Sequence, residues 1–146
     1  LPEVWEDEFV SIQERYKRGV FALDTALFLH DLTDRTPHKF HMAFPYGYNT
    51  SSPKAAGILC SCKKEPYYSL GIALVDTPAG NTVRAYNAEK TLCEILKPIS
   101  HTDIQIITDA FKRYAGRKDK NIPLLSEYAH QLRVEKRLRP YLEVLL

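Results

Sequence analysis

The stretch that decides the fold runs from Tyr16 to Asn49 and reads YKRGVFALDTALFLHDLTDRTPHKFHMAFPYGYN. Its order of apolar and turn-forming residues predicts the end of one helix, a second short helix, a turn and a strand. Asp24 is suited to an N-cap, so we expect a helix over residues 25–32. Pro37 disfavours helical geometry at the residue before it, which predicts a turn over residues 33–37.

A sheet is indicated from His38 onward. In residues 38–44, Phe40, Met42 and Phe44 recur at every second position, the period of a half-buried strand. Further short strands are expected at 58–64, 71–76 and 82–86. The last two are separated by residues 77–81 (TPAGN), a turn sequence that predicts a hairpin. The sheet is therefore expected to be at least partly antiparallel.

Helices are predicted on both sides of these strands. Residues 6–17 carry apolar side chains at helical spacing, and Gly19 is placed to end that helix. The second half predicts a helix capped by Asn87, a helix over 102–114 capped by Thr102 or Ser100, one from Pro123 to about Leu132, and one over 134–146 that Pro140 kinks or divides. The expected fold is a single α/β domain (α+β-like), with a small mixed, partly antiparallel sheet flanked by N-terminal and C-terminal helices.

Composition indicates an ordinary folded protein, with 45% hydrophobic and 26% charged residues. No apolar run approaches the roughly 20 residues that a membrane-spanning helix needs. Cys60, Cys62 and Cys93 are too few for a disulfide framework, which favours reduced thiols in a cytoplasmic protein. Glycine-rich phosphate loops, a GxSxG elbow and an HExxH helix do not occur in the sequence, so no cofactor is expected.

Charge is distributed unevenly along the chain. Residues 1–14 hold five acids and no base, whereas residues 111–139 hold nine bases against three acids, a local charge of +6. A basic C-terminal half suits an anionic partner, either nucleic acid or an acidic protein face, although a solvated helix surface has the same composition. The candidate anion-binding residues are Lys112, Arg113, Arg117, Lys118, Arg133, Lys136 and Arg137.

Several side chains could support chemistry instead. His30 could act as a general base oriented by Asp31 or Asp34, but a buried or half-buried histidine that bonds a loop carbonyl is the simpler expectation.

Asp76, Arg84, Glu89 and Lys90 resemble the acids and bases of a metal-dependent nuclease, without the Glu-x-Lys spacing on a strand; Glu89 fits better in the first turn of a helix. Cys60 and Cys62 with His38 or His41 could hold a metal, but buried thiols are commoner and no metal is expected. A third hypothesis is a protein-binding patch of exposed tyrosines, drawn from Tyr46, Tyr48, Tyr67 and Tyr68.

An ordered set of short motifs covers nearly the whole chain. It comprises Gly19, TALFLH (25–30), DRTP (34–37), PYGYN (45–49), the hairpin residues Thr77, Gly80, Val83 and Arg84, the helix residues Tyr86, Glu89, Lys90, Thr91, Glu94, Ile95 and Leu96, then DAFKRY (109–114), LSEYA (125–129) and YLEVLL (141–146). This set resembles the C-terminal domain of AbiEi-type antitoxins from bacterial abortive-infection systems. Of the motif residues, His30, Arg35, Arg84 and Glu89 have no assigned role.

The resemblance implies a cytoplasmic bacterial protein of phage defence, which acts as an antitoxin and transcriptional regulator in a type IV toxin-antitoxin system. Such antitoxins bind promoter DNA through an N-terminal winged helix, and we expect that domain to be missing here because the chain opens at Leu1 without methionine. The implied toxin is an AbiEii-type nucleotidyltransferase. The resemblance implies that the antitoxin opposes this toxin without forming a stable complex with it. The alternative function is a metal-dependent nuclease-like enzyme or hydrolase that acts on nucleic acid.

Overall fold

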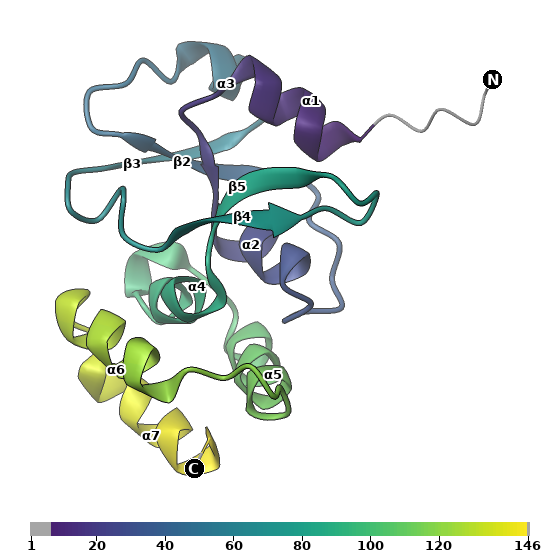
Figure 1. Cartoon of the computed structure of the whole chain (residues 1–146). Helices are drawn as coiled ribbons and strands as arrows, with labels where there is room; N and C mark the ends of the chain where they lie inside the picture. Colours follow the sequence, from purple (N-terminus) through teal and green to yellow (C-terminus); the bar gives the residue numbers. More distant parts are fainter. Residues whose placement is uncertain (1–6, 146) are drawn as a thin grey trace.

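A five-stranded sheet lies at the centre of the computed structural model, which describes residues 7–145, and helices lie on both sides of it (Figure 1). The strands are β1 (Val20–Phe21), β2 (His41–Pro45), β3 (Leu59–Lys63), β4 (Ile72–Asp76) and β5 (Thr82–Tyr86), in the order β3-β2-β1-β5-β4. β1 pairs antiparallel with β2 and parallel with β5, β2 pairs parallel with β3, and β4 pairs antiparallel with β5. The predicted α/β class, the mixed sheet and the hairpin are confirmed.

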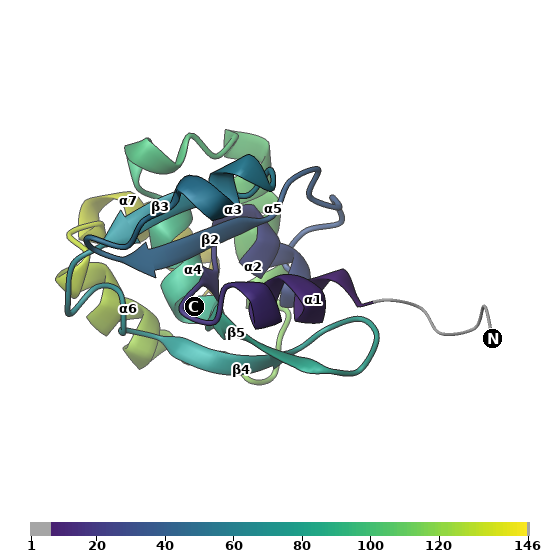
Figure 2. The same cartoon turned by 90° about the horizontal axis from the view of Figure 1, so that it is seen from above.

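The N-terminal helix packs on one face of the sheet. α1 (Glu8–Arg15) begins at the N-cap Asp7 and buries Phe9 against Phe21 of β1, with ring centroids 5.4 Å apart. Asp7 also accepts hydrogen bonds from Thr77 and Asn81, which attach the start of α1 to the β4–β5 turn. Figure 2 shows α1 lying over the strands from above. Glu6, which the sequence placed in this helix, lies outside the described residues.

The second short helix, predicted over residues 25–32, both begins and ends earlier than predicted. α2 spans Leu23–Leu29 and its N-cap is Ala22, so the assignment of Asp24 as N-cap was wrong. The chain passes straight from β1 into α2, and the Ala22 N–H donates to the carbonyl of His41 in β2. Because the sheet already holds this residue, no side-chain cap is needed, and Asp24 lies within the first turn instead.

Helices of the second half form the other side of the molecule. They are α4 (Ala88–Ile95), the 3-10 turn η1 (Pro98–Ser100), α5 (Ile104–Ala115), α6 (Ile122–Gln131) and α7 (Glu135–Leu145). Asn87 caps α4 as predicted, Asp103 rather than Thr102 or Ser100 caps α5, and Pro140 lies inside an undivided α7. Their buried faces meet in one cluster that includes Leu92, Phe111, Leu125 and Leu138. Leu146 of the predicted last helix lies outside the described residues.

Three elements were not predicted: β1, α3 and the 3-10 turn η1. β1 is two fully buried residues, and so short an apolar run carries no readable period. α3 (Ser51–Ala55) lies in a segment of Ser, Pro and Gly that favours a loop. In Figure 1, α1 and α3 lie on one side of the sheet and α4–α7 lie on the other.

Candidate functional site

Glu89 joins two helices in the interior. Its carboxylate is buried on the first turn of α4 and accepts a 2.6 Å hydrogen bond from the Tyr114 hydroxyl of α5. The same hydroxyl accepts a 2.7 Å hydrogen bond from the backbone N–H of Asn121, at the start of α6. Burial raises the pKa of Tyr114, with the Glu89 carboxylate contributing, so the phenol keeps its proton at neutral pH. The Glu89–Tyr114 pair thus connects α4, α5 and the start of α6.

Lys90 is fully buried beside it, which is rare for a lysine. Its ammonium donates to the carbonyls of Tyr67 and Leu70, at 2.8 Å and 2.7 Å, and lies 3.8 Å from the centroid of the Tyr86 ring. Burial lowers the pKa of Lys90 to about 8. Lys90 therefore holds the loop before β4 against α4, and its ammonium is inside the protein.

His30 is half-buried and bonds a backbone carbonyl, as the simpler hypothesis predicted, but that carbonyl belongs to a strand and not to a loop. Its Nε2 lies 2.8 Å from the carbonyl of Tyr86, at the end of β5, which requires the tautomer protonated at Nε2 for a neutral ring. Burial lowers the pKa of His30. Arg117 donates to the His30 carbonyl at 3.0 Å, so the end of α2 is held by both β5 and the α5–α6 loop.

Arg84 and Arg35 have different environments. Arg84 donates from its guanidinium to the Lys17 carbonyl at 2.7 Å and to the Tyr68 hydroxyl at 3.3 Å, which ties β5 to the α1–β1 loop. Its backbone N–H donates to the Gln13 side chain of α1. Arg35 is exposed in the turn before β2, and its backbone N–H donates to the Thr33 hydroxyl.

The two acids of the nuclease hypothesis are not brought together. Asp76 is exposed opposite Thr82 at one end of the β4–β5 hairpin. Glu89 follows Tyr86, which lies at the other end of β5. The four-residue advance from Thr82 to Tyr86 alone spans about 13 Å, far more than two ligands of one metal ion are separated.

Nor do the described residues form a metal site elsewhere in the structure. Within residues 7–145, the histidine, cysteine and acidic side chains form no group of three or more that could hold a metal ion. Cys60 donates its thiol proton to the Ile58 carbonyl, and Cys62 is exposed.

Among the four tyrosines of the proposed protein-binding patch, Tyr68 is buried, Tyr48 is stacked on Phe44, and only Tyr46 and Tyr67 are exposed. The hypothesis of an exposed tyrosine patch is therefore wrong for Tyr48 and Tyr68.

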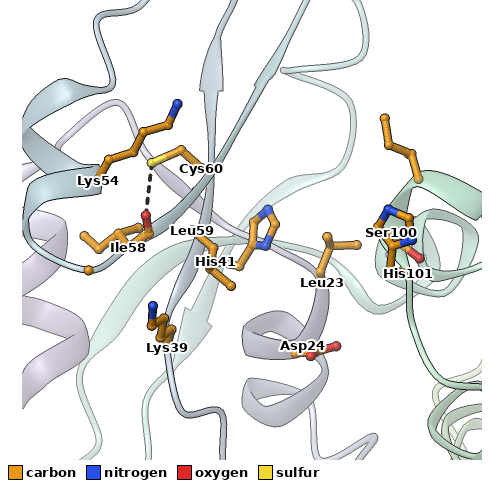
Figure 3. Close-up of a pocket in the computed structure, with 12 residues that line it drawn as sticks. Leu23, Asp24, Lys39, His41, Lys54, Ile58, Leu59, Cys60, Ser100 and His101 are labelled. Atoms are coloured by element: carbon orange, nitrogen blue, oxygen red, sulfur yellow. Dashed lines mark hydrogen bonds between the residues drawn. The ribbon is translucent and has the colours of Figure 1, made fainter.

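A cavity of about 540 Å³ lies between β3, the start of α2 and η1 (Figure 3). Leu23, Leu59 and Ile99 supply apolar surface, and Lys39 and Lys54 are the two cations at its border. Asp24 also lines the cavity, and burial raises the pKa of its carboxyl group.

His41 lies in the wall of this cavity and contacts a buried polar cluster behind it. Its Nε2 is 3.3 Å from the Ser61 hydroxyl, and burial together with the Lys63 ammonium lowers the pKa of His41 to about 4. Lys63 forms a 2.6 Å ion pair with Glu94 of α4, whose side chain is 3% exposed. The second carboxylate oxygen of Glu94 has no protein partner among the described residues. Sequence reasoning missed this pair because its two residues lie far apart in the chain.

The basic residues gather on the helical side of the molecule. Lys112 and Arg113 are exposed on α5, Lys118 on the α5–α6 loop, Arg133 before α7, and Lys136 and Arg137 on α7. α5 and α7 pack together through the rings of Phe111 and Tyr141, whose centroids are 4.4 Å apart. The candidate cations are therefore carried by adjacent elements.

Two members of that set are already paired. Arg113 forms a 2.8 Å ion pair with Asp109 on its own helix. Arg117 pairs with Asp119 at 2.8 Å, and that hydrogen bond raises its pKa. The other five, Lys112, Lys118, Arg133, Lys136 and Arg137, form no ion pair within the described part of the chain.

Comparison of the chain with models of known protein families finds no match. A search of curated proteins finds no relative either. None of the helices within residues 7–145 is both long enough and apolar enough to cross a lipid bilayer.

Proposed function

We propose that this chain is a non-enzymatic regulatory domain of the AbiEi antitoxin type, which opposes a nucleotidyltransferase toxin and binds nucleic acid through the cations of α5 and α7. One observation carries the proposal. The polar motif residues His30, Arg84 and Glu89 are engaged in contacts between elements. The cations on the helical side, in contrast, are exposed.

Engagement of the motif residues argues against the enzyme alternative. A general acid or base must reach a substrate proton, and a metal ligand must present a free lone pair. The Glu89 carboxylate is buried and bonded to Tyr114, and the Lys90 ammonium is bonded to two carbonyls. These residues stabilise the domain, which accounts for their place in the motif without catalysis.

Exposed lysine and arginine side chains on adjacent helices are what phosphate contacts require. Such contacts are independent of base sequence and weaken as salt rises, because counterions released on binding return to the nucleic acid. Five exposed cations without an ion pair within residues 7–145 leave that charge available.

The basic surface lies away from α1. Asp7 ties the start of α1 to the β4–β5 turn, and the sheet separates α1 from α5–α7 (Figure 1). A winged helix N-terminal to α1 would therefore be attached on the α1 side of the sheet, opposite the basic surface (Figure 1). We infer that α5 and α7 contact a second segment of nucleic acid rather than the operator bases next to the winged helix.

The test combines growth rescue with a binding assay. The chain is co-expressed with the nucleotidyltransferase encoded beside it, as wild type, as Lys136→Glu/Arg137→Glu, and as Lys39→Glu/Lys54→Glu. The two double variants change net charge equally, but the second pair lies at the cavity beside β3. Asp76→Ala tests the enzyme alternative at an exposed position.

We expect the wild type, the Lys39/Lys54 variant and Asp76→Ala to rescue growth, and the Lys136/Arg137 variant to fail while folding normally. In fluorescence titrations with duplex DNA, that variant should reduce the slope of log K against log salt by about 2. Loss of rescue by Asp76→Ala would favour the enzyme. Equal loss in both double variants would show that net charge, and not this surface, is responsible.

A further inference from the structure

One edge of the sheet presents open backbone groups. The Thr77 N–H donates to Asn81 and the Asn87 N–H donates to Gly71, at the two ends of the β4–β5 ladder. In an antiparallel ladder, hydrogen-bonded pairs alternate with pairs that are not bonded to each other. The pairs at the two ends, 77–81 and 71–87, are both hydrogen-bonded pairs. The alternation between them makes Ala73 and Val75 the residues of β4 whose backbone groups bond to β5. The backbone groups of Ile72, Leu74 and Asp76 therefore point away from the sheet.

Part of this edge is already used, and its centre is not. The Ile72 N–H donates to the Ser69 carbonyl. The same alternation of bonded pairs directs both the N–H and the carbonyl of Leu74 outward, away from β5. The side chain of Leu74 is 76% exposed in the middle of the strand.

Sheet edges are normally protected by lysine, proline, a bulge or a covering element, because an open edge pairs with other strands. The sequence of β4, IALVD, contains neither lysine nor proline, and its register with β5 is unbroken. The opposite edge strand, β3, ends in Lys63 and is followed by Lys64. β4 is thus the less protected of the two edges.

A groove of about 690 Å³ runs along this edge. Residues 73–76 of β4 and residues 77–78 of the turn after it form one wall. The end of α2, with Phe28, Leu29, His30 and Asp31, and the α5–α6 loop, with Arg117 and Asp119, form the rest. The groove therefore offers a strand edge, an apolar wall and charged residues within one depression.

Charge in the groove is negative. Asp31, Asp76 and Asp119 carry three negative charges against Arg117, whose guanidinium is already bonded to Asp119 and to the His30 carbonyl. His30 adds no charge at neutral pH, because burial lowers its pKa. A basic occupant is favoured over an acidic one.

The same charge disfavours a second copy of this chain. Two β4 strands paired about a two-fold axis at Leu74 would bring two acidic grooves together. Like charges placed across an interface weaken it.

We propose that the β4 edge binds an extended segment of another protein as an added antiparallel strand, with a lysine or arginine opposite Asp76 and an apolar residue opposite Leu74. Main-chain hydrogen bonds at Leu74 supply the affinity, and side chains at alternate positions supply the choice of partner. This inference does not depend on the proposed function, because its main-chain contacts are made by β4 and not by the cations of α5 and α7.

The probe is a fluorescein-labelled, capped heptapeptide, Ser-Lys-Thr-Val-Lys-Val-Ser, whose first lysine, first valine and second valine would face Asp76, Leu74 and Ile72. The control peptide replaces both lysines by glutamate. Affinity is measured by fluorescence anisotropy, and exchange of the Leu74 amide with deuterium is followed by NMR. Leu74→Pro removes the outward N–H, and Leu74→Ala keeps it. Asp76→Lys is matched by Asp34→Lys, an exposed acid in the turn before β2.

We expect the lysine peptide to bind with a Kd below about 1 mM and to slow Leu74 exchange at least about tenfold. Leu74→Pro and Asp76→Lys should each weaken peptide binding about tenfold or more. Leu74→Ala should weaken it less, and Asp34→Lys should leave the Kd unchanged. Asp76→Lys should bind the glutamate peptide better than wild type does.

Unchanged Leu74 exchange at saturating peptide would overturn the proposal, as would binding that Leu74→Pro leaves intact. Circular dichroism and thermal melting confirm that each variant is folded; if Leu74→Pro is not, Leu74 exchange in the wild type decides. A concentration-dependent dimer in analytical ultracentrifugation that Leu74→Pro abolishes would show that a second copy occupies the edge instead.

Discussion

The Tyr114 hydroxyl donates a 2.6 Å hydrogen bond to the buried Glu89 carboxylate. It accepts one from the Asn121 N–H as well, so a single oxygen connects α4, α5 and the cap of α6. A carboxylate held in this way is a structural group, although the sequence also allows it as a metal ligand.

Removal of that oxygen should cost stability. Tyr114→Phe leaves the Glu89 carboxylate and the Asn121 N–H without their partner, and we expect the free energy of unfolding to fall by about 2–4 kcal/mol. Glu89→Gln keeps an acceptor for Tyr114 and should cost only about 1 kcal/mol. Urea titration followed by circular dichroism measures both. Tyr46→Phe, at an exposed tyrosine, is the control. An equal loss of unfolding free energy in that variant would contradict a structural role for the Tyr114 hydroxyl.

Stability should also depend on pH through His41. Its pKa is about 4 in the folded protein, against an unfolded value of 6.5. Between those values the unfolded chain binds more protons than the folded one, so stability falls as pH decreases from about 6.5 to about 4. The contribution is at most about 3 kcal/mol.

His41→Gln should flatten that part of the stability profile, measured by urea titration at several pH values. His30, whose pKa is also lowered, contributes with the same sign, so the profile keeps a smaller slope. His38→Gln, at an exposed histidine, should leave the profile unchanged. A profile that is the same with His41→Gln would show that His41 titrates normally.

Arg117 and Lys118 are neighbours with different expected roles. Arg117 joins the α5–α6 loop to the carbonyl of His30, so Arg117→Ala should lower the melting temperature with a loss of about 1 kcal/mol and leave salt-dependent DNA affinity nearly unchanged. Lys118→Ala should weaken DNA binding and leave the melting temperature nearly unchanged, because Lys118 is exposed. Thermal melts and DNA titrations of both variants distinguish the two roles. Equal effects on DNA affinity would place Arg117 in the proposed nucleic-acid-binding surface.

Gly71 and Gly80 share a left-handed backbone and differ in surroundings. Gly71 has a φ of +83°, and a Cβ there would lie 2.8 Å from the Cβ of Lys90. Gly80 has a φ of +89° with open space around it. Gly80→Ala should therefore cost about 1 kcal/mol from backbone strain, and Gly71→Ala clearly more, because the buried α4 cannot move away. Similar melting temperatures for the two variants would contradict this.

Local signals predicted much of the fold because they depend on neighbouring residues. The cap at Asn87, the proline in the first turn of α6 and the turn between β4 and β5 each follow from side chains within a few positions. Asp24 shows the limit of such signals. It has the chemistry of an N-cap, but the sheet bond at Ala22 decides where α2 begins.

By itself, then, the sequence determined the α/β class, the hairpin, the helices of the second half and the basic character of their exposed side chains. The tertiary structure alone decided that Val20 and Phe21 form the central strand, that Glu89 and His30 have interior partners, and that the edge of β4 is open. The physical reason is distance along the chain. Helix caps and turns are stabilised by bonds between near neighbours, whereas strand order and the partners of buried polar groups depend on residues that only folding brings together.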